Sequence, residues 1–537
     1  MEVYCKAFLV CCVITLTQSQ NYNETRLKIH DLAKNYKLKF GVATSANQIE
    51  GAWNESGRVE SIWDHFIHED PSRVVDGSNA DVSCDSYHNL DRDISMLKYL
   101  GVQFYRFSLS WPRIAPIPMQ RGNAAGLRYY HNLIDKLIEN NIIPIVSMNH
   151  FDIPQNIQDF GGWTNELIVD YFENYARIVL DNFADKVKVW VTFIEPDNVC
   201  RQHDLSNDWP PIYGSSGISN YLCARNVILA HARVYHLYKK YYDTENKGMM
   251  GIGYSFNWYE PLTNSTEDIE VIEKLRTMVY GLFADPIYSS TGDFPDILKA
   301  TIANKSMEQG FLKSRLPEWT IAEIEYIRNA YDFLGVNYYT SYKQPRIPSE
   351  PQPIPSFTDD LGYYKGVYDV TWKNTTVEWL RNHAEGLKLV LIYLKKIYNN
   401  PKILILENGC GSSHDKLENY ECVDYYKDHL DAVYDAVVNH GCNVLAYTAW
   451  CLMDNFEWEM GYTHKFGLFH TDFKNESRPA KPKATAEFFK EILTDVKTNN
   501  QNFDQQIGSI NGATNLVTHV SIIFVFIINL ILLFDSY

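Results

Sequence analysis

Short runs of strand-forming residues alternate with amphipathic stretches along most of this 537-residue chain. Between most of the runs, apolar residues recur with a helical period. Eight strands that alternate with helices predict an α/β fold, a single (β/α)8 barrel with long βα loops, whose active site lies at the C-terminal rim of the strands. The strand-like runs cover residues 40–48, 104–111, 142–151, 187–196, 249–259, 333–340, 403–408 and 444–450, and the helical stretches cover 85–100, 127–140, 165–183, 221–242, 377–398 and 423–440.

Two of these strand-like runs carry a glutamate at or near their end. Glu407 follows the apolar residues 403–406 and precedes an Asn-Gly turn, and Glu195 follows the run that begins at residue 187. A single glutamate in such a place is more often solvated or turn-stabilising than catalytic. Two on one barrel rim indicate paired-carboxylate chemistry.

Other strand ends supply hydrogen-bonding or aromatic side chains to the same rim. Taken singly, each has an ordinary explanation as a core histidine, a structural ion pair or a packed aromatic. Together they predict one binding face, built by Gln48, Arg106, His150, Asn337, Tyr339, Trp450, Glu457 and Trp458.

Composition narrows the class of ligand. The 37 tyrosines and 12 tryptophans exceed what packing usually requires and suit a carbohydrate or apolar ligand. A formal charge of −17 argues against nucleic acid or an anionic membrane as the main partner. The sequence contains no Cys-x-x-Cys, no His-Glu-x-x-His and no Gly-rich phosphate loop, so neither a metal nor a cofactor is expected.

Both ends of the chain are apolar. Residues 1–19 read as a secretory signal peptide, and six Asn-x-Ser/Thr sequons fit that route. Residues 506–537 contain a 15-residue apolar run, 520–534, which predicts either a glycosylphosphatidylinositol signal or a short single-pass anchor. Either anchor places the body of the protein outside the cell, with the C-terminal tail as its contact with the membrane.

Seven cysteines remain once the signal peptide is removed. An oxidising compartment allows Cys200 to pair with Cys223, and Cys410 with Cys422, although spacing alone leaves the pairing open. The odd count predicts at least one free thiol, expected to be buried.

Seven short motifs resemble those of glycoside hydrolase family 1, the β-glucosidase and myrosinase family. The resemblance runs from about residue 40 to residue 489, within a domain expected over 20–505. The motifs are Gln48-Ile49-Glu50-Gly51, Tyr105-Arg106-Phe107-Ser108, Asn149-His150-Phe151-Asp152, Thr192-Phe193-Ile194-Glu195-Pro196, Asn337-Tyr338-Tyr339-Thr340, Glu407-Asn408-Gly409 and Met453-Asp454-Asn455-Phe456-Glu457-Trp458.

This resemblance implies a retaining β-glycosidase that acts on β-glucosides or related glycosides, with water as its only co-substrate. It implies that Glu407 is the nucleophile and Glu195 the acid/base, and that Arg106, Asn337 and Tyr339 surround Glu407. The sugar would be held by Gln48, His150, Trp450, Glu457 and Trp458.

One residue departs from the family pattern. The family usually has Asn-Glu-Pro where this chain has Ile194-Glu195-Pro196, and that asparagine hydrogen-bonds the 2-hydroxyl of the sugar. The departure predicts slow hydrolysis of ordinary β-glucosides. It also allows a surface-anchored sugar-binding or receptor protein that has lost efficient turnover.

The aglycone is not fixed by the sequence, nor is the oligomeric state. Trp372, Trp379 and Phe469 are candidates for the aglycone pocket, which variable loops build. Arg201 lies six residues after Glu195, where an anionic aglycone can approach, so a thioglucosidase is a further alternative. A solvated loop charge is the commoner role for such an arginine.

Overall fold

The computed structural model describes residues 22–201, 209–211, 214–344, 353–362 and 366–496. The signal peptide and the C-terminal anchor expected from the sequence lie outside these residues. Within the described part of the chain, no helix is long and apolar enough to cross a membrane.

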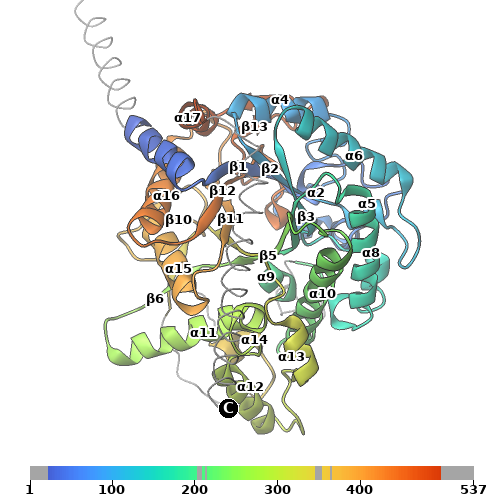
Figure 1. Cartoon of the computed structure of the whole chain (residues 1–537), viewed down its shortest axis with the longest axis vertical. Coiled ribbons are helices and arrows are strands. Elements are labelled where there is room, and N and C mark those ends of the chain that lie inside the picture. Colours follow the sequence, from blue (N-terminus) through green and yellow to red (C-terminus); the bar gives the residue numbers. More distant parts are fainter. Residues whose placement is uncertain (1–21, 202–208, 212–213, 345–352, 363–365, 497–537) are drawn as a thin grey trace, which may run out of the picture.

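Eight parallel strands close into a barrel, which confirms the predicted fold (Figure 1). Their order around the barrel is β1-β12-β11-β7-β5-β4-β3-β2, so each strand lies beside its neighbours in chain order and the last pairs with the first. The strands are β1 (Lys39–Ala43), β2 (Phe104–Ser108), β3 (Ile143–Asn149), β4 (Val189–Ile194), β5 (Met249–Ser255), β7 (Phe333–Tyr338), β11 (Ile403–Asn408) and β12 (Val444–Trp450).

Helices surround this barrel, as Figure 1 shows. Their apolar faces pack on the outside of the strands in one large buried cluster. The principal helices are α4 (Leu90–Leu100), α6 (Ala124–Glu139), α8 (Ile168–Phe183), α10 (Ser219–Tyr241), α11 (Thr266–Tyr288), α15 (Ala384–Ile397), α16 (Tyr420–Val438) and α17 (Ala484–Leu493).

The βα loops carry further short elements. Helices α12 (Asp296–Glu308), α13 (Ile321–Ile327) and α14 (Phe357–Leu361) gather with α11 at one end of the molecule (Figure 1). The remaining short elements are α2 (Ala46–Ile49), α3 (Ile62–Glu69), α5 (Trp111–Ile114), α7 (Gln155–Gln158), α9 (Pro196–Arg201), β6 (Trp258–Pro261), β8 (Ser341–Gln344), β9 (Lys373–Asn374), β10 (Arg381–Asn382), β13 (Phe469–Thr471) and β14 (Ala480–Pro482).

Several predicted boundaries were wrong in detail. Strand β1 ends at Ala43, and Gln48 lies instead on helix α2, whose first N–H, from Ala46, donates to Ser108 Oγ at 2.7 Å. Trp111 opens helix α5 rather than ending β2, because Pro112 fits the first turn of a helix. Residues 258–261 form β6, which pairs with β8 outside the barrel, and α15 starts at Ala384 rather than at residue 377.

A second, smaller apolar cluster fills the barrel interior below the rim. Every barrel strand except β1 contributes at least one residue to this cluster. Its members are Phe104, Ile145, Val189, Val191, Ile194, Met249, Phe333, Leu404, Leu406 and Ala446. Gly253 makes room for this packing, because a Cβ there would lie 2.7 Å from Leu406 Cδ1. The polar side chains at the strand ends therefore lie directly above a packed apolar layer.

Candidate active site

Glu407 is buried near the end of β11, where the strand's register against β7 shifts by one residue. This bulge brings Glu407 opposite Asn337 directly after Leu406, which packs into the inner cluster. The two carboxylate oxygens have different partners. Oε1 accepts a hydrogen bond from Arg106 Nη2, and Oε2 accepts one from the Tyr339 hydroxyl at 2.7 Å.

These partners decide the charge of Glu407. Burial raises the pKa of Glu407, while the Arg106 guanidinium and the Tyr339 hydroxyl oppose that rise. A carboxylate paired with a buried arginine keeps its negative charge and a fixed orientation. Glu407 can therefore act as a nucleophile.

Arg106 is fully buried on β2 and connects several strand ends. Besides Glu407, its Nη2 donates to Leu406 O at 3.2 Å, and its Nη1 lies 3.3 Å from His150 Nδ1. Because a guanidinium can only donate, Nδ1 of His150 is the acceptor and its proton sits on Nε2. Burial lowers the pKa of His150 well below its ordinary value, and the Arg106 charge lowers it further, so the ring is neutral with one N–H left for a ligand.

Glu195 follows the last residue of β4, where that strand also shifts register against β5. Its backbone has a positive φ of 48°, and its N–H donates to Gly253 O at 2.8 Å. The side chain accepts hydrogen bonds from two amides. Asn337 Nδ2 donates to Oε1 at 2.9 Å, and Asn198 Nδ2 donates to Oε2.

No arginine or lysine donates to Glu195 in the hydrogen bonds of the described residues. Burial raises the pKa of Glu195 to about 8, with the charges of Glu407 and Asp197 as further causes. Glu195 is therefore protonated at neutral pH beside an ionised Glu407. Two carboxyl groups held in opposite protonation states are what acid-assisted nucleophilic substitution requires.

Gln48 joins helix α2 to the segment that follows β12. Its Nε2 donates to Asn455 Oδ1 at 3.1 Å, to Phe456 O at 3.0 Å and to Glu457 Oε2 at 3.3 Å. Burial raises the pKa of Glu457 well above its ordinary value, and the neighbouring Glu459 adds to the rise. This corner offers several closely spaced donors and acceptors, as adjacent sugar hydroxyls need.

Aromatic rings flank the same space. The centroid of the His150 ring lies 5.7 Å from that of Trp450 and 6.0 Å from that of Trp458. Trp450 also lies under the Arg106 guanidinium, at 5.2 Å. Such faces can cover the apolar side of a sugar ring.

A cavity of about 410 Å³ opens at the carboxyl ends of the strands. Of the ten site residues predicted from the sequence, Gln48, Arg106 and Asn337 lie behind the cavity wall, in hydrogen-bond contact with residues that form it. The other seven line the cavity: His150, Glu195, Tyr339, Glu407, Trp450, Glu457 and Trp458.

Sequence reasoning missed most of the outer wall. Of the three aromatics suggested for the aglycone pocket, only Trp379 lines the cavity. Trp372 stacks on His383, with ring centroids 4.3 Å apart, and Phe469 is buried in β13. The outer wall is instead built largely from residues that no motif marks: Asn198 on α9, Ser255 at the end of β5, Tyr342 on β8, and Trp209, Asn257, Glu459, Met460, His464 and Phe466. Arg201, considered from the sequence as a contact for an anionic aglycone, lines the cavity as well.

Ile194 does not line the cavity. Its side chain is fully buried in the inner apolar cluster with Leu406. A Cβ built on Gly253 would lie 3.3 Å from Ile194 Cδ1, which shows how closely this packing approaches β5. Position 194 therefore contributes packing and no hydrogen-bonding group.

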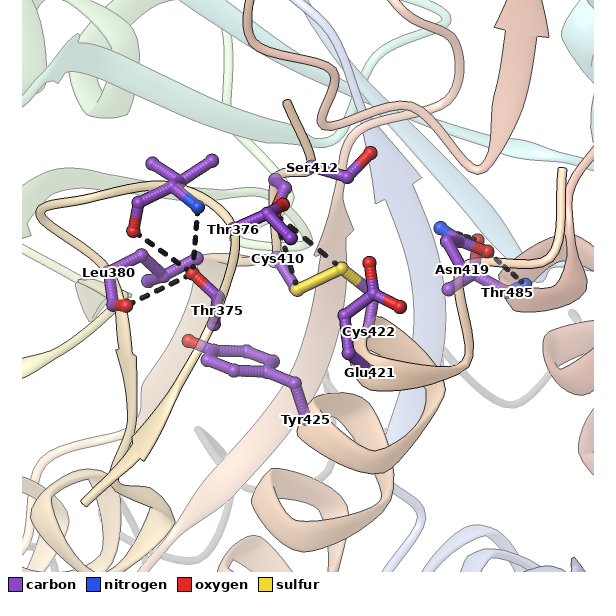
Figure 2. The surroundings of a disulfide bond; sticks show 12 residues. Thr375, Thr376, Leu380, Cys410, Ser412, Asn419, Glu421, Cys422, Tyr425 and Thr485 are labelled. Atoms are coloured by element: carbon purple, nitrogen blue, oxygen red, sulfur yellow. Dashed lines mark hydrogen bonds between the residues drawn. A yellow bond between two sulfur atoms is a disulfide. The ribbon is translucent and has the colours of Figure 1, made fainter. Parts of the chain in front are cut away.

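A disulfide fastens the segment that follows Glu407 (Figure 2). Cys410, just past the end of β11, is bonded to Cys422 in the first turn of α16. Tyr425 on the same helix donates to Tyr339 O at 2.6 Å. Helix α16 thus braces both the strand that carries Glu407 and the tyrosine that binds it.

A second disulfide lies a few residues after Glu195, as the first lies after Glu407. It joins Cys200 on α9 to Cys223 near the start of α10. Both of the pairings considered from the sequence are therefore confirmed. The three thiols that remain among the described residues, Cys84, Cys442 and Cys451, are buried as expected.

The family model, the sequence relatives and the solved structures that this chain resembles all point to the same family. The family described as "Glycosyl hydrolase family 1" matches residues 34–498. Myrosinase 1 of Brevicoryne brassicae is 38% identical over 85% of this chain and 97% of its own length, and cytosolic β-glucosidase of Homo sapiens is 36% identical over 84% and 96%. A solved rice β-glucosidase mutant, in a covalent complex with Glc, superposes with a TM-score of 0.78 at 34% identity, covering 85% of this chain and 97% of that one.

Proposed function

The chain belongs to glycosyl hydrolase family 1 and is a retaining β-glycosidase, and from that premise we propose that it hydrolyses β-glucosides through a covalent intermediate on Glu407. The observation that carries this proposal is that two buried glutamates in one cavity have different hydrogen-bond partners. Glu407 is held by an arginine and a tyrosine, whereas the hydrogen bonds that Glu195 receives from side chains of the described residues come from two amides, beside that negative charge.

In the first step, Glu407 attacks the anomeric carbon while Glu195 gives its proton to the leaving oxygen. The bond from the anomeric carbon to the leaving group breaks as the bond to a Glu407 oxygen forms. Arg106 and Tyr339 keep Glu407 ionised and aimed until the attack.

In the second step the roles of the glutamates change. Glu195, now ionised, takes a proton from water as the water attacks the same carbon, and Glu407 leaves as a carboxylate. Two inversions restore the original β configuration. The two amides that donate to Glu195 stabilise its ionised form in this step.

The glycone is held by the inner part of the cavity. His150 Nε2–H supplies a donor for ring hydroxyls, and Glu457, which Gln48 holds from behind the cavity wall, supplies acceptors. Trp450 and Trp458 cover the apolar face. The similarity to human cytosolic β-glucosidase supports a glucose-type glycone.

A panel of nitrophenyl β-glycosides tests the proposal. We expect nitrophenol release from the β-glucoside, no release from the α-glucoside, and β-glucose as the first product seen by ¹H NMR, because double displacement retains configuration. An α-configured first product would overturn the covalent step. Absence of release from every glycoside in the panel would overturn the function itself.

Ile194→Asn tests the departure from the family pattern. Ile194 is the last residue of β4, directly before Glu195, so the prediction requires the asparagine side chain to turn from the apolar cluster toward the cavity and donate to the 2-hydroxyl in the transition state. In that orientation we expect kcat for β-glucosides to rise by up to about a hundredfold with little change in KM. The same amide enters an apolar cluster, so we expect a loss of about 2 kcal/mol in unfolding free energy.

The matched control is Ile194→Val, which removes one methylene, keeps the position apolar and should leave kcat unchanged. Stopped assays and thermal melts of both variants separate the two effects. If Ile194→Asn hydrolyses β-glucosides no faster than the natural protein, a missing contact to the 2-hydroxyl does not limit the reaction and the glucoside assignment fails.

A thioglucosidase is the second candidate, favoured by the position of Arg201. The structure places this arginine in the cavity wall, where its Nη2 donates to Asn198 Oδ1. A guanidinium there can attract an anionic aglycone. The other alternative, a sugar-binding receptor without turnover, depends on Ile194 alone, and neither the site nor the relatives support it.

An extracellular, membrane-anchored location is part of the proposal. Two disulfides support folding in an oxidising compartment. The apolar segments expected to act as signal peptide and anchor support it from the sequence.

A further inference from the structure

We propose that Asn198 is a positioning residue for the acid/base, which directs the proton of Glu195 into the cavity. This inference rests on the proposed function, because it concerns the proton that the leaving oxygen receives. Helix α9 begins directly after Glu195, so Asn198 lies in its first turn and its side chain returns to the carboxyl group. Asn198 lines the cavity beside Glu195.

The orientation of the Asn198 amide is fixed from its other side. Arg201, three residues further along the helix, donates from Nη2 to Asn198 Oδ1. An amide can in principle turn over and exchange its oxygen for its nitrogen. Because a guanidinium can only donate, the oxygen must face Arg201 and the nitrogen must face Glu195.

The second oxygen of Glu195 also faces an amide. Asn337 Nδ2 donates to Oε1, and the same side chain donates toward the ionised Glu407, whose pKa it lowers, so the nitrogen of Asn337 faces both carboxyl groups. When Glu195 is protonated, neither amide can accept that proton. Its acceptor must come from the cavity, which is where the glycosidic oxygen of a substrate lies.

The same two amides also stabilise Glu195 in the ionised state that follows proton transfer. Two N–H donors stabilise the carboxylate, which then has to act as a base toward water. Charged and titratable groups also surround Glu195 on several sides, and they are unchanged by substitution of Asn198: Glu407 on β11, Tyr339 after β7, Glu457 after β12, and Asp197 and Arg201 on α9.

Asn198→Ala tests the proposal through the pH profile of kcat/KM. The amide favours the ionised form, so its loss raises the pKa of Glu195, and the enzyme stays protonated to higher pH. The alkaline limb should therefore move upward by about one pH unit. Asn257→Ala is the matched control, since it removes another amide from the cavity wall and should leave the limb in place.

The leaving group gives an independent readout. A poor leaving group such as an alkoxide needs the proton, whereas 2,4-dinitrophenolate departs without it. Asn198→Ala should reduce kcat/KM about tenfold for an alkyl β-glucoside and by less than about twofold for the dinitrophenyl β-glucoside. Arg201→Met, which leaves the amide free to turn, should show the same pattern in weaker form.

An unshifted alkaline limb together with equal losses on both substrates would overturn the inference and leave Asn198 a merely structural residue. Failure of the proposed function looks different, because the natural protein itself would then hydrolyse none of these substrates. Thermal melts of each variant show whether a loss comes from unfolding.

Discussion

Glu407→Gln should lower the hydrolysis of every β-glycoside by at least about 10⁴-fold while the protein remains folded. The amide is nearly isosteric with the carboxylate, so the packing against Leu406 and Tyr339 is kept. It carries no negative charge and cannot form the bond to the anomeric carbon. The barrel itself does not depend on the reaction, so circular dichroism should match that of the natural protein.

Glu459→Gln is the matched control for this variant. Glu459 lines the same cavity, but the mechanism gives it no bond to make or break. Both variants remove one negative charge, so an effect of charge alone would appear in both. Comparable losses in the two variants, or activity of the natural level in Glu407→Gln, would rule out Glu407 as the nucleophile.

Glu195→Gln should separate substrates by their leaving groups. Proton donation contributes roughly 10² to 10⁴ to the rate, so alkyl β-glucosides should lose that factor in kcat/KM. The dinitrophenyl β-glucoside should still react with Glu407 and release one equivalent of phenolate in a burst. Steady-state turnover should then be slow, because no base activates the water.

Sodium azide supplies the check on this second variant. Azide is a nucleophile that needs no general base, so it should restore turnover of the dinitrophenyl substrate and yield a β-glycosyl azide. The natural protein should gain nothing from azide. An equal loss on both substrates without rescue would show that Glu195 acts in binding or folding rather than in proton transfer.

The barrel could be predicted because its strands are short apolar runs that end at polar motifs. Ile403–Asn408 is an example, since its four aliphatic residues lead directly to Glu407. Helix α11 was not recognised, because Gly281 and Pro286 interrupt its pattern and two of its apolar residues, Ile269 and Val271, are exposed. Gln48 was assigned to a strand end because its pattern does not distinguish a strand from the short helix α2.

The inner half of the site could be predicted and the outer half could not. Arg106 and Tyr339 stand in motifs at strand ends, and barrel closure alone brings strand ends together. Tyr342 reaches the cavity from β8, outside the barrel, and Phe466 from a loop, and the path of both segments depends on tertiary contacts. The register shifts before Glu195 and Glu407 leave no mark in the sequence, although they help to place both side chains at the rim.

The disulfide between Cys200 and Cys223 has a consequence for how substrate range can change. It closes a loop that contains Trp209 of the cavity wall, and its sulfur atoms anchor the loop to α9 and α10. Arg201 directly follows Cys200 on α9 and holds Asn198, so it belongs with the catalytic residues. Insertions or exchanges inside the closed loop need not shift the backbone of Glu195, because the cross-link holds that end of the segment. The chain therefore separates a constant catalytic pair from a replaceable recognition segment, so new aglycones can be accommodated by loop exchange while the chemistry is retained.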